Sequence, residues 1–231
     1  MYNHFYQHFH FEIKNGCIVY KDGSDVVLLD TGSQQTINVA NDHLHIFPKI
    51  HEFVDSSITI LKGMNTMSHR KILVDYLNSE IFINGIPEIE SPIARFEIDL
   101  RDLWPTIQIS IDGQMHRVLL DTGARTSYLF TPYVNVGNPV GEIDDFFIGE
   151  PSLFKVKLFE HRVDVGDQPV CMNFAPPTES IANTLVYLGV DGIIGYEFFR
   201  NFKVLFDFER RRFVVGRLSS TLALHFLALL R

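Results

Sequence analysis

The sequence predicts a mostly β protein built from two related lobes. Three observations lead to this class: apolar and polar residues alternate along many short segments, helical patterns are few, and one ordered set of motifs occurs twice. The chain has 231 residues, of which 46% are apolar, so it can bury a core large enough for two lobes. We place the first lobe at residues 1–92 and the second at residues 93–231.

Alternating segments place the strands, and turn residues bound them. The expected strands are His10–Tyr20 before a turn at Lys21–Gly23, Thr106–Ile111 before a turn at Asp112–Gly113, Leu153–Val165, and Val204–Val215. Helices are expected at Thr178–Leu185 and Ser219–Leu230. The segment Asn84–Pro92 contains two prolines and a glycine, and we interpret it as the linker between the lobes.

The repeat is centred on a short motif. Val27–Ser33 reads VLLDTGS and Val118–Ala124 reads VLLDTGA. Further along, residues 63–83 align with residues 195–215 without a gap, and a glycine, a lysine, a leucine and an aspartate match. Both halves therefore follow one order: strand, aspartate motif, variable segment, glycine, then strand–turn–strand. This order indicates an internal duplication and predicts an approximate twofold axis between the lobes.

Two Asp-Thr-Gly motifs, each after an apolar strand and each followed by an apolar-apolar-glycine element or a near variant, resemble the aspartic peptidase superfamily of pepsins and retropepsins. LLDTGARTSYL and LGVDGIIGYEFF make the second lobe most similar to the retropepsin-like subfamily. The resemblance implies the acid protease fold: two β-barrel-like lobes with an active-site cleft between them. It also implies that Asp30 and Asp121 are catalytic, activating a water between them and sharing one proton.

The same resemblance gives roles to the neighbours of the two aspartates. Thr31 and Thr122 are expected to hydrogen-bond across the two loops, so that losing one loosens the spacing of the carboxylates. Gly32 and Gly123 let the backbone turn tightly and approach the partner loop.

The fourth position of the motif differs between the copies, with Ser33 in one and Ala124 in the other. A hydroxyl at this position hydrogen-bonds the catalytic carboxylate in pepsin-like enzymes and favours its charged form, whereas alanine leaves that bond unmade. We therefore expect Ser33 to stabilise ionised Asp30, with a pH optimum between the strongly acidic range and neutrality.

Spacing indicates which lobe covers the cleft. Gly195 lies more than twice as far beyond Asp121 as Gly63 lies beyond Asp30. The family places a hairpin, the flap, between these two elements, so we expect one at about residues 143–157 and none in the first lobe. The residues expected at its mobile tip, against the substrate, are Ile148, Gly149, Glu150 and Pro151.

Three residues depart from the family pattern. Lys62 stands where the second lobe has Ile194, so either its side chain reaches the surface or the alignment is shifted by one residue. Trp104 is expected to anchor the linker. Arg125 stands where retropepsins commonly have an acidic residue, so subsite preferences do not carry over.

Charge and composition bear on partners and location. The net charge of −8 argues against nucleic acid, and Arg210–Arg212 is interpreted as a solvated turn. No apolar run approaches the roughly 20 residues of a membrane span, and the first residues lack a secretion signal. We expect a cytoplasmic monomer without a membrane partner, with Leu222–Leu230 packed across the lobes. Cys17 and Cys171 are too few for a disulfide framework.

Other functions were weighed against peptide hydrolysis. His4, His8 and His10 have a spacing that suits a metal, but no carboxylate or thiol clearly completes a site, so we expect an exposed strand face, no metal and no cofactor. The leading interpretation is an aspartic-type endopeptidase acting on a peptide or protein substrate. The alternative, suggested by Lys62 and the short first lobe, is a peptide-binding or scaffold protein without turnover. Glycoside hydrolysis is disfavoured because its carboxyl groups stand roughly 5 Å or more apart.

Overall fold

The computed structural model describes residues 6–85, 88–131, 133–134 and 137–217. His4 and the helix expected at Ser219–Leu230, with its apolar segment Leu222–Leu230, lie outside these residues. The structure is mostly β, with 47% strand and 14% helix. Within the described ranges, no helix combines the length and apolar character needed to cross a membrane.

The elements follow each other in two comparable series. Those of the first half are β1 (Gln7–Lys14), β2 (Cys17–Asp22), β3 (Asp25–Leu29), β4 (Ile37–Asn38), the 3-10 helix η1 (Val39–Asn41), α1 (Phe47–Phe53), β5 (Ile60–Lys62), α2 (Met64–Met67), β6 (Lys71–Asp75) and β7 (Glu80–Ile83). Those of the second half are β8 (Pro92–Glu97), β9 (Asp99–Arg101), β10 (Trp104–Ile111), β11 (Gln114–Leu120), β12 (Ser127–Leu129), β13 (Gly141–Asp145), β14 (Phe154–Val165), β15 (Gln168–Ala175), α3 (Glu179–Leu188), β16 (Gly192–Ile194), α4 (Tyr196–Phe199), β17 (Lys203–Asp207) and β18 (Arg212–Gly216).

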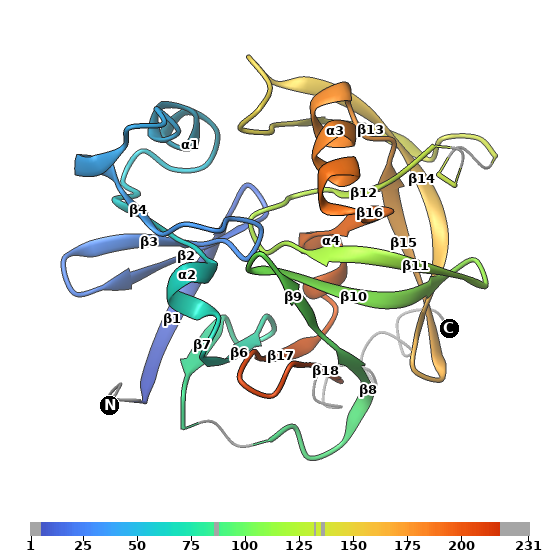
Figure 1. Cartoon of the computed structure of the whole chain (residues 1–231), viewed down its shortest axis with the longest axis horizontal. Helices are drawn as coiled ribbons and strands as arrows, with labels where there is room; N and C mark the ends of the chain where they lie inside the picture. Colours follow the sequence, from blue (N-terminus) through green and yellow to red (C-terminus); the bar gives the residue numbers. More distant parts are fainter. Residues whose placement is uncertain (1–5, 86–87, 132, 135–136, 218–231) are drawn as a thin grey trace, which may run out of the picture.

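The described strands form two sheets. The larger has the order β4-β5-β3-β2-β1-β7-β6-β17-β18-β8, and the smaller has the order β13-β14-β15-β12-β16-β11-β10-β9. In Figure 1, β1 to β4 lie on the left and β10 to β16 on the right, with β6, β7, β17, β18 and β8 below. The C-terminal hairpin thus shares a sheet with the first half, and the division at residues 92/93 stays a prediction.

The aligned repeats meet at the centre of the larger sheet. β6 pairs with β17 in antiparallel fashion, and Leu73 stands opposite Leu205, its counterpart in the alignment. Lys71 likewise faces Asp207, while the equivalent lysine, Lys203, faces Asp75. Two equivalent strands that pair symmetrically about equivalent residues are what an approximate twofold axis between the halves requires.

Hydrophobic packing follows the same division. One cluster belongs to the first half and includes Leu28 and Leu61, and another belongs to the second half and includes Leu119 and Ile193. The largest cluster contains buried residues of both halves. It includes side chains of β6, β17 and β18 together with side chains of the strands that carry the two motifs. Because the halves share this core, they hold their motif loops at a fixed separation.

The expected strands Thr106–Ile111 and Leu153–Val165 and one expected helix are found close to their expected bounds, whereas Val204–Val215 is divided into β17 and β18 and the first expected strand is also not continuous. A turn at Asn15 and Gly16, both at positive φ, divides the expected strand His10–Tyr20 into β1 and β2. An Asn-Gly pair is the residue choice for a tight hairpin, because both positions of that turn need positive φ. The hairpin expected at residues 143–157 is formed by β13 and β14, paired from Gly141–Leu158 to Asp145–Phe154.

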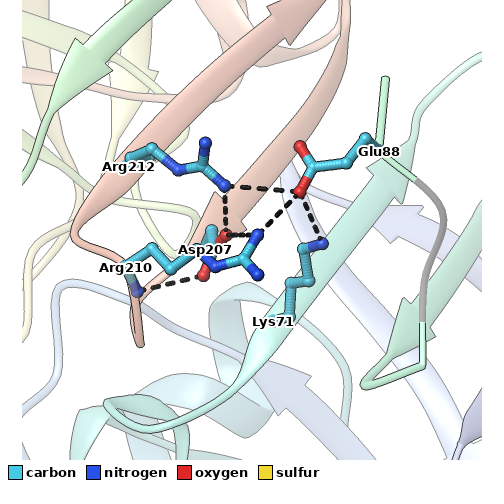
Figure 2. A network of polar contacts seen from close by, with 5 residues as sticks. All are labelled: Lys71, Glu88, Asp207, Arg210 and Arg212. Carbon is cyan, nitrogen blue, oxygen red and sulfur yellow. Dashed lines mark hydrogen bonds and ion pairs between the residues drawn. The ribbon is translucent and has the colours of Figure 1, made fainter. Parts of the chain in front are cut away.

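The linker is held by a cluster of charges. Figure 2 shows the Glu88 carboxylate in contact with Lys71 (3.1 Å), Arg210 (3.0 Å) and Arg212 (3.3 Å). Arg212 also binds Asp207 at 2.9 Å. The hydrogen bond from Lys71 is the largest cause that holds the pKa of Glu88 below its ordinary value. Arg210 of the β17–β18 turn and Arg212 at the start of β18 therefore bind the linker, so the expected solvated turn at Arg210–Arg212 is only partly found.

Candidate active site

Each aspartate motif begins where a buried strand ends beside a parallel partner. Asp30 follows β3, which pairs with β5, and its backbone N–H donates to the Lys62 carbonyl at 3.1 Å. Asp121 follows β11, which pairs with β16, and its N–H donates to the Ile194 carbonyl at 2.9 Å. Equivalent strand pairs thus place the two aspartates equivalently.

The two loops lock together through their threonines. The Thr31 N–H donates to the Thr122 hydroxyl at 3.1 Å, and the Thr122 N–H donates to the Thr31 hydroxyl at 3.0 Å. Each hydroxyl in turn donates to a carbonyl at the end of the opposite strand, Leu120 at 2.7 Å and Leu29 at 2.9 Å. Both threonines are buried, so these bonds are exchanged in a dry environment that strengthens them.

The glycines allow the aspartates to approach one another. A Cβ atom on Gly123 would lie 2.6 Å from Asp30 Cγ, and a Cβ atom on Gly32 would overlap the Asp121 carboxylate. Each carboxylate therefore packs against the glycine of the other copy, where any side chain would collide. The expected roles of both glycines have this geometric basis.

Backbone N–H groups orient each carboxylate. Asp30 Oδ1 accepts from Gly32 at 2.8 Å and Ser33 at 3.0 Å. Asp121 Oδ1 accepts from Gly123 at 2.8 Å and Ala124 at 3.1 Å.

The expected role of the Ser33 hydroxyl is wrong. Ser33 Oγ donates to the Gln35 carbonyl at 3.0 Å and forms no hydrogen bond with Asp30, so the bond that Ser33 makes to Asp30 comes from its backbone. Ser33 and Ala124 therefore present the same N–H donor to their aspartates.

The two carboxyl groups differ in how firmly they hold a proton. Burial and then the charge of Asp121 raise the pKa of Asp30 well above its ordinary value. Burial also raises the pKa of Asp121, while the Gly123 N–H and the hydrogen bond to Asp30 offset part of that rise. Both side chains are surrounded by protein yet retain partial exposure towards the cleft. Two close carboxylates cannot both ionise cheaply, so we expect the pair to titrate as a unit that shares one proton.

Lys62 occupies its expected alignment position. It pairs with Leu29 as Ile194 pairs with Leu120, which leaves the alignment unshifted. Its side chain is largely covered, with Nζ 2.9 Å from the Tyr20 hydroxyl and 3.8 Å from the Asp22 carboxylate. Burial lowers its pKa, and the charge of Asp22 opposes that effect. The contacts with Tyr20 and Asp22 thus accommodate the lysine in this partly buried position.

Each half also sends one side chain to the glycine of the other half. The Trp104 indole N–H donates to the Gly32 carbonyl at 3.0 Å, so Trp104 braces the first motif loop instead of anchoring the linker. The Cys17 thiol lies 3.2 Å from the Gly123 carbonyl. Burial and the charges of Asp30 and Asp121 raise the pKa of Cys17, which keeps this thiol protonated as a donor. The pattern of the sequence contains no signal for either contact.

A cleft of about 200 Å³ opens above the aspartates. Residues from both halves line it, including Ile50 and Leu61 from the first and Ile181 and Ile193 from the second. The loop that joins β13 to β14 covers it through Phe146, Phe147 and Ile148. Of the four residues expected at the tip, Ile148 lines the cleft, whereas Gly149, Glu150 and Pro151 do not.

The covering loop is attached to the first half. Lys49 of α1 donates from Nζ to the Ile148 carbonyl at 2.7 Å and also to the Glu150 carbonyl. The Phe53 and Phe146 rings lie 5.7 Å apart beside this contact. The loop therefore contacts both halves and narrows the opening of the cleft above the aspartates.

A third carboxylate lies in the cleft. Asp145, at the end of β13, is 2% exposed and accepts a hydrogen bond of 2.6 Å from the Tyr128 hydroxyl. Arg125 lines the same cleft and donates to the Asp144 carbonyl at 3.1 Å. Asp145 was not expected from the sequence, because its position in the cleft depends on how the β13–β14 hairpin folds back.

Comparison with known proteins adds no assignment: no model of a known protein family matches the chain, and no curated protein matches it significantly.

Proposed function

We propose that this protein is an aspartic-type endopeptidase with the acid protease fold, in which Asp30 and Asp121 are the catalytic pair. The observation that carries the proposal is the reciprocal exchange of hydrogen bonds between Thr31 and Thr122. It brings two buried strand ends together and leaves two carboxyl groups side by side at the floor of a cleft. A purely structural pair of buried acids would have no need of that access.

The pKa values suggest a division of labour. Asp121 takes a proton from the attacking water, while protonated Asp30 gives its proton to the oxygen of the scissile carbonyl. The water oxygen bonds to the carbonyl carbon and forms a tetrahedral diol. As the C–N bond breaks, the proton on Asp121 passes to the leaving nitrogen, and a proton from the diol returns to Asp30. The carboxyl groups thereby exchange roles without any covalent intermediate.

The β13–β14 hairpin fits the part of a flap. Its loop covers the cleft with two phenylalanines and an isoleucine, which favours apolar side chains beside the cut bond. The cleft of about 200 Å³ is smaller than typical ligand sites of about 300–1,000 Å³. The loop therefore has to lift before a peptide strand can enter, and Lys49 would be released in that step.

A second function, binding of a peptide without turnover, is suggested by Lys62 and the short first half. One experiment separates the two. The purified parent protein and the Asp30→Asn and Asp121→Asn variants are incubated with a diverse peptide mixture at several pH values between about 3 and 7. New peptide termini are identified by mass spectrometry, with and without a statine-type inhibitor.

The matched control is Asp102→Asn, which changes an exposed aspartate outside the cleft lining to the same residue type. We expect the parent and this control to cleave, the inhibitor to block them, and both dyad variants to be inactive. Cleavage that survives in either dyad variant would contradict the assignment of the pair. Peptide that binds to a folded but inactive parent would favour the binding function instead.

A further inference from the structure

Two histidines and a glutamate meet on a surface of the larger sheet. His8 and His10 are two residues apart on β1, so both side chains point to one face of the strand. β1 pairs with β7, and the register places Glu80 directly opposite His10 and Phe82 opposite His8. The sequence pattern indicated no carboxylate partner for these histidines. The fold supplies one, because Glu80 lies 72 residues beyond His8 in the chain but on the neighbouring strand.

The three side chains have the spacing of metal ligands. One ligand atom from each of them lies within 4.8 Å of those of the other two. His8 Nε2 is 3.2 Å from Glu80 Oε1, and the His8 and His10 rings are 5.3 Å apart. The His8 ring also stacks on Phe82, with centroids 4.4 Å apart and planes 2° from parallel. Stacking limits the rotation of the ring and so lowers the entropy that a ligand would have to overcome.

We propose that His8, His10 and Glu80 form a site for a zinc-like divalent transition-metal ion. Two imidazoles and one carboxylate are a ligand set that zinc uses, with a fourth position left for water. Mg²⁺ and Ca²⁺ prefer oxygen ligands, so this set discriminates against them. Among the described residues, no other group of histidine, cysteine, aspartate and glutamate side chains has this spacing.

The site is separate from the proposed catalytic pair. None of its three residues lines the cleft above Asp30 and Asp121. Its ligands come from two neighbouring strands of one sheet, so a bound ion would join β1 to β7 (Figure 1). Its effect is therefore on the attachment of the first strand, and peptide hydrolysis does not require it.

Binding of zinc by the full chain tests this site. The protein is stripped with a chelator and titrated with ZnCl₂ in an isothermal calorimeter, with MgCl₂ as the comparison ion. We expect one zinc ion per chain with micromolar or tighter affinity, no response to magnesium, and a higher Tm with zinc, because an ion that binds the folded state stabilises it. NMR of the parent is expected to show shifts of the His8 and His10 ring signals.

Variants assign the ligands. His8→Ala with His10→Ala is expected to abolish the tight site. Glu80→Gln keeps the size of the side chain and is expected to weaken zinc binding at least about tenfold, since even outer partners of metal ligands are worth 10–100-fold. His43→Ala with His45→Ala is the matched control, because these are also exposed histidines two residues apart, and its affinity is expected to equal that of the parent.

Three results would overturn the proposal: no zinc bound by the parent, unchanged binding in the His8/His10 variant, or equal loss of binding in the His43/His45 control. Circular dichroism of each variant shows whether it is folded. If the His8/His10 variant does not fold, ring shifts confined to other histidines of the parent would reject the site. Zinc binding is measured without peptide substrate, so failure here leaves the proposed function untouched.

Discussion

The two halves of the molecule have equivalent strand pairings around Asp30 and Asp121, but they differ in the segments inserted after those strands. β4 pairs with β5 through Ile37 and Leu61, and β12 pairs with β16 through the equivalent Tyr128 and Ile193. Between β4 and β5 the first half has only η1 and α1, whereas the described residues between β12 and β16 of the second half form β13, β14, β15 and α3. The shared part fixes the carboxyl pair, which tolerates little change. The segments that differ lie beside the cleft. The second half contributes the β13–β14 loop, and the first half contributes Lys49, which holds that loop.

The largest expected effect on activity comes from forcing the two aspartate loops apart. In Gly123→Ala the new Cβ would lie 2.6 Å from Asp30 Cγ, so the loops have to separate. A displacement of about 1 Å at reacting groups costs about 100-fold in rate, and we expect at least that loss of kcat/KM on a cleaved peptide. Gly141→Ala is the control, since its nearest neighbour is Leu158 at 4.0 Å. Equal activity of both variants would show that the loops do not need this contact.

Breaking one cross-loop bond is expected to affect stability next. Thr31→Val keeps the shape of the side chain but leaves the Leu120 carbonyl and the Thr122 N–H unpaired. Each unpaired buried group costs about 1–3 kcal/mol, and the free energy of unfolding in urea is expected to fall accordingly. The same substitution at Thr122 is expected to cost a similar amount, because the bonds are reciprocal.

Thr126→Val is the matched control for these variants. Its buried hydroxyl lies near Tyr128 but makes no hydrogen bond of good geometry among the described residues, so its removal is expected to be close to neutral. If Thr126→Val lowers the free energy of unfolding as much as Thr31→Val does, the cross-loop hydrogen bonds do not stabilise the fold more than any other buried threonine does.

A smaller effect is expected where the halves differ. Lys49→Ala removes the contact between α1 and the covering loop and frees the loop to lift. Because a closed cleft lowers the population that accepts peptide, we expect KM to fall about two- to fivefold, corresponding to an exposed charged contact of about 0.5–1 kcal/mol. Lys155→Ala, which changes an exposed lysine of β14 beside the same loop, is expected to leave KM unchanged. A higher KM in Lys49→Ala would mean that the lysine closes the loop over bound peptide instead.

The smallest effect is expected at the fourth position of the motif. Ser33→Ala makes the two copies alike, and the lost hydroxyl donates to Gln35 instead of Asp30. A hydrogen bond to a charged group is worth about 1.5–3 kcal/mol, which corresponds to about 1–2 pH units in the profile of kcat/KM. We expect a displacement well below this range. A displacement within it would restore the role that the sequence suggested for Ser33.

The parts of the fold that local patterns determine could be predicted from the sequence. The paired motifs, the repeat that forms β6 and β17, and the β13–β14 hairpin all have short-range signals. Thr178 was expected to begin a helix, and it caps α3 by accepting from the Ile181 N–H. The turn at Asn15–Gly16 also has a local signal, which the longer alternation across it concealed.

Features that depend on long-range packing could not be predicted. α1 has only seven residues and contains a proline, and its first N–H groups are capped by Asp42, so it is stable only in its tertiary setting. The contacts of Trp104 and Cys17 with the motif glycines join residues far apart in the chain. Glu80 meets His8 and His10 only because β7 pairs with β1.

The central claim is that the two unequal copies meet as a buried pair that shares one proton. Because the pKa of Asp30 is raised in the folded chain, the folded state binds this proton more tightly than the unfolded state does. Stability from this group is therefore present below its ordinary value of 3.8 and is lost as the pH rises through its folded value. Asn cannot ionise, so Asp30→Asn escapes this loss.

The most direct measurement is the Tm of the parent and of Asp30→Asn by calorimetry at pH values from about 3 to 8. We expect similar Tm values at the acidic end and a higher Tm for Asp30→Asn at neutral pH, with a smaller gain for Asp121→Asn and none for the exposed control Asp102→Asn. A difference of 1 kcal/mol is resolvable, because it moves Tm by about 2–4 °C in a chain of this size. A Tm difference that does not change with pH would contradict the shared proton.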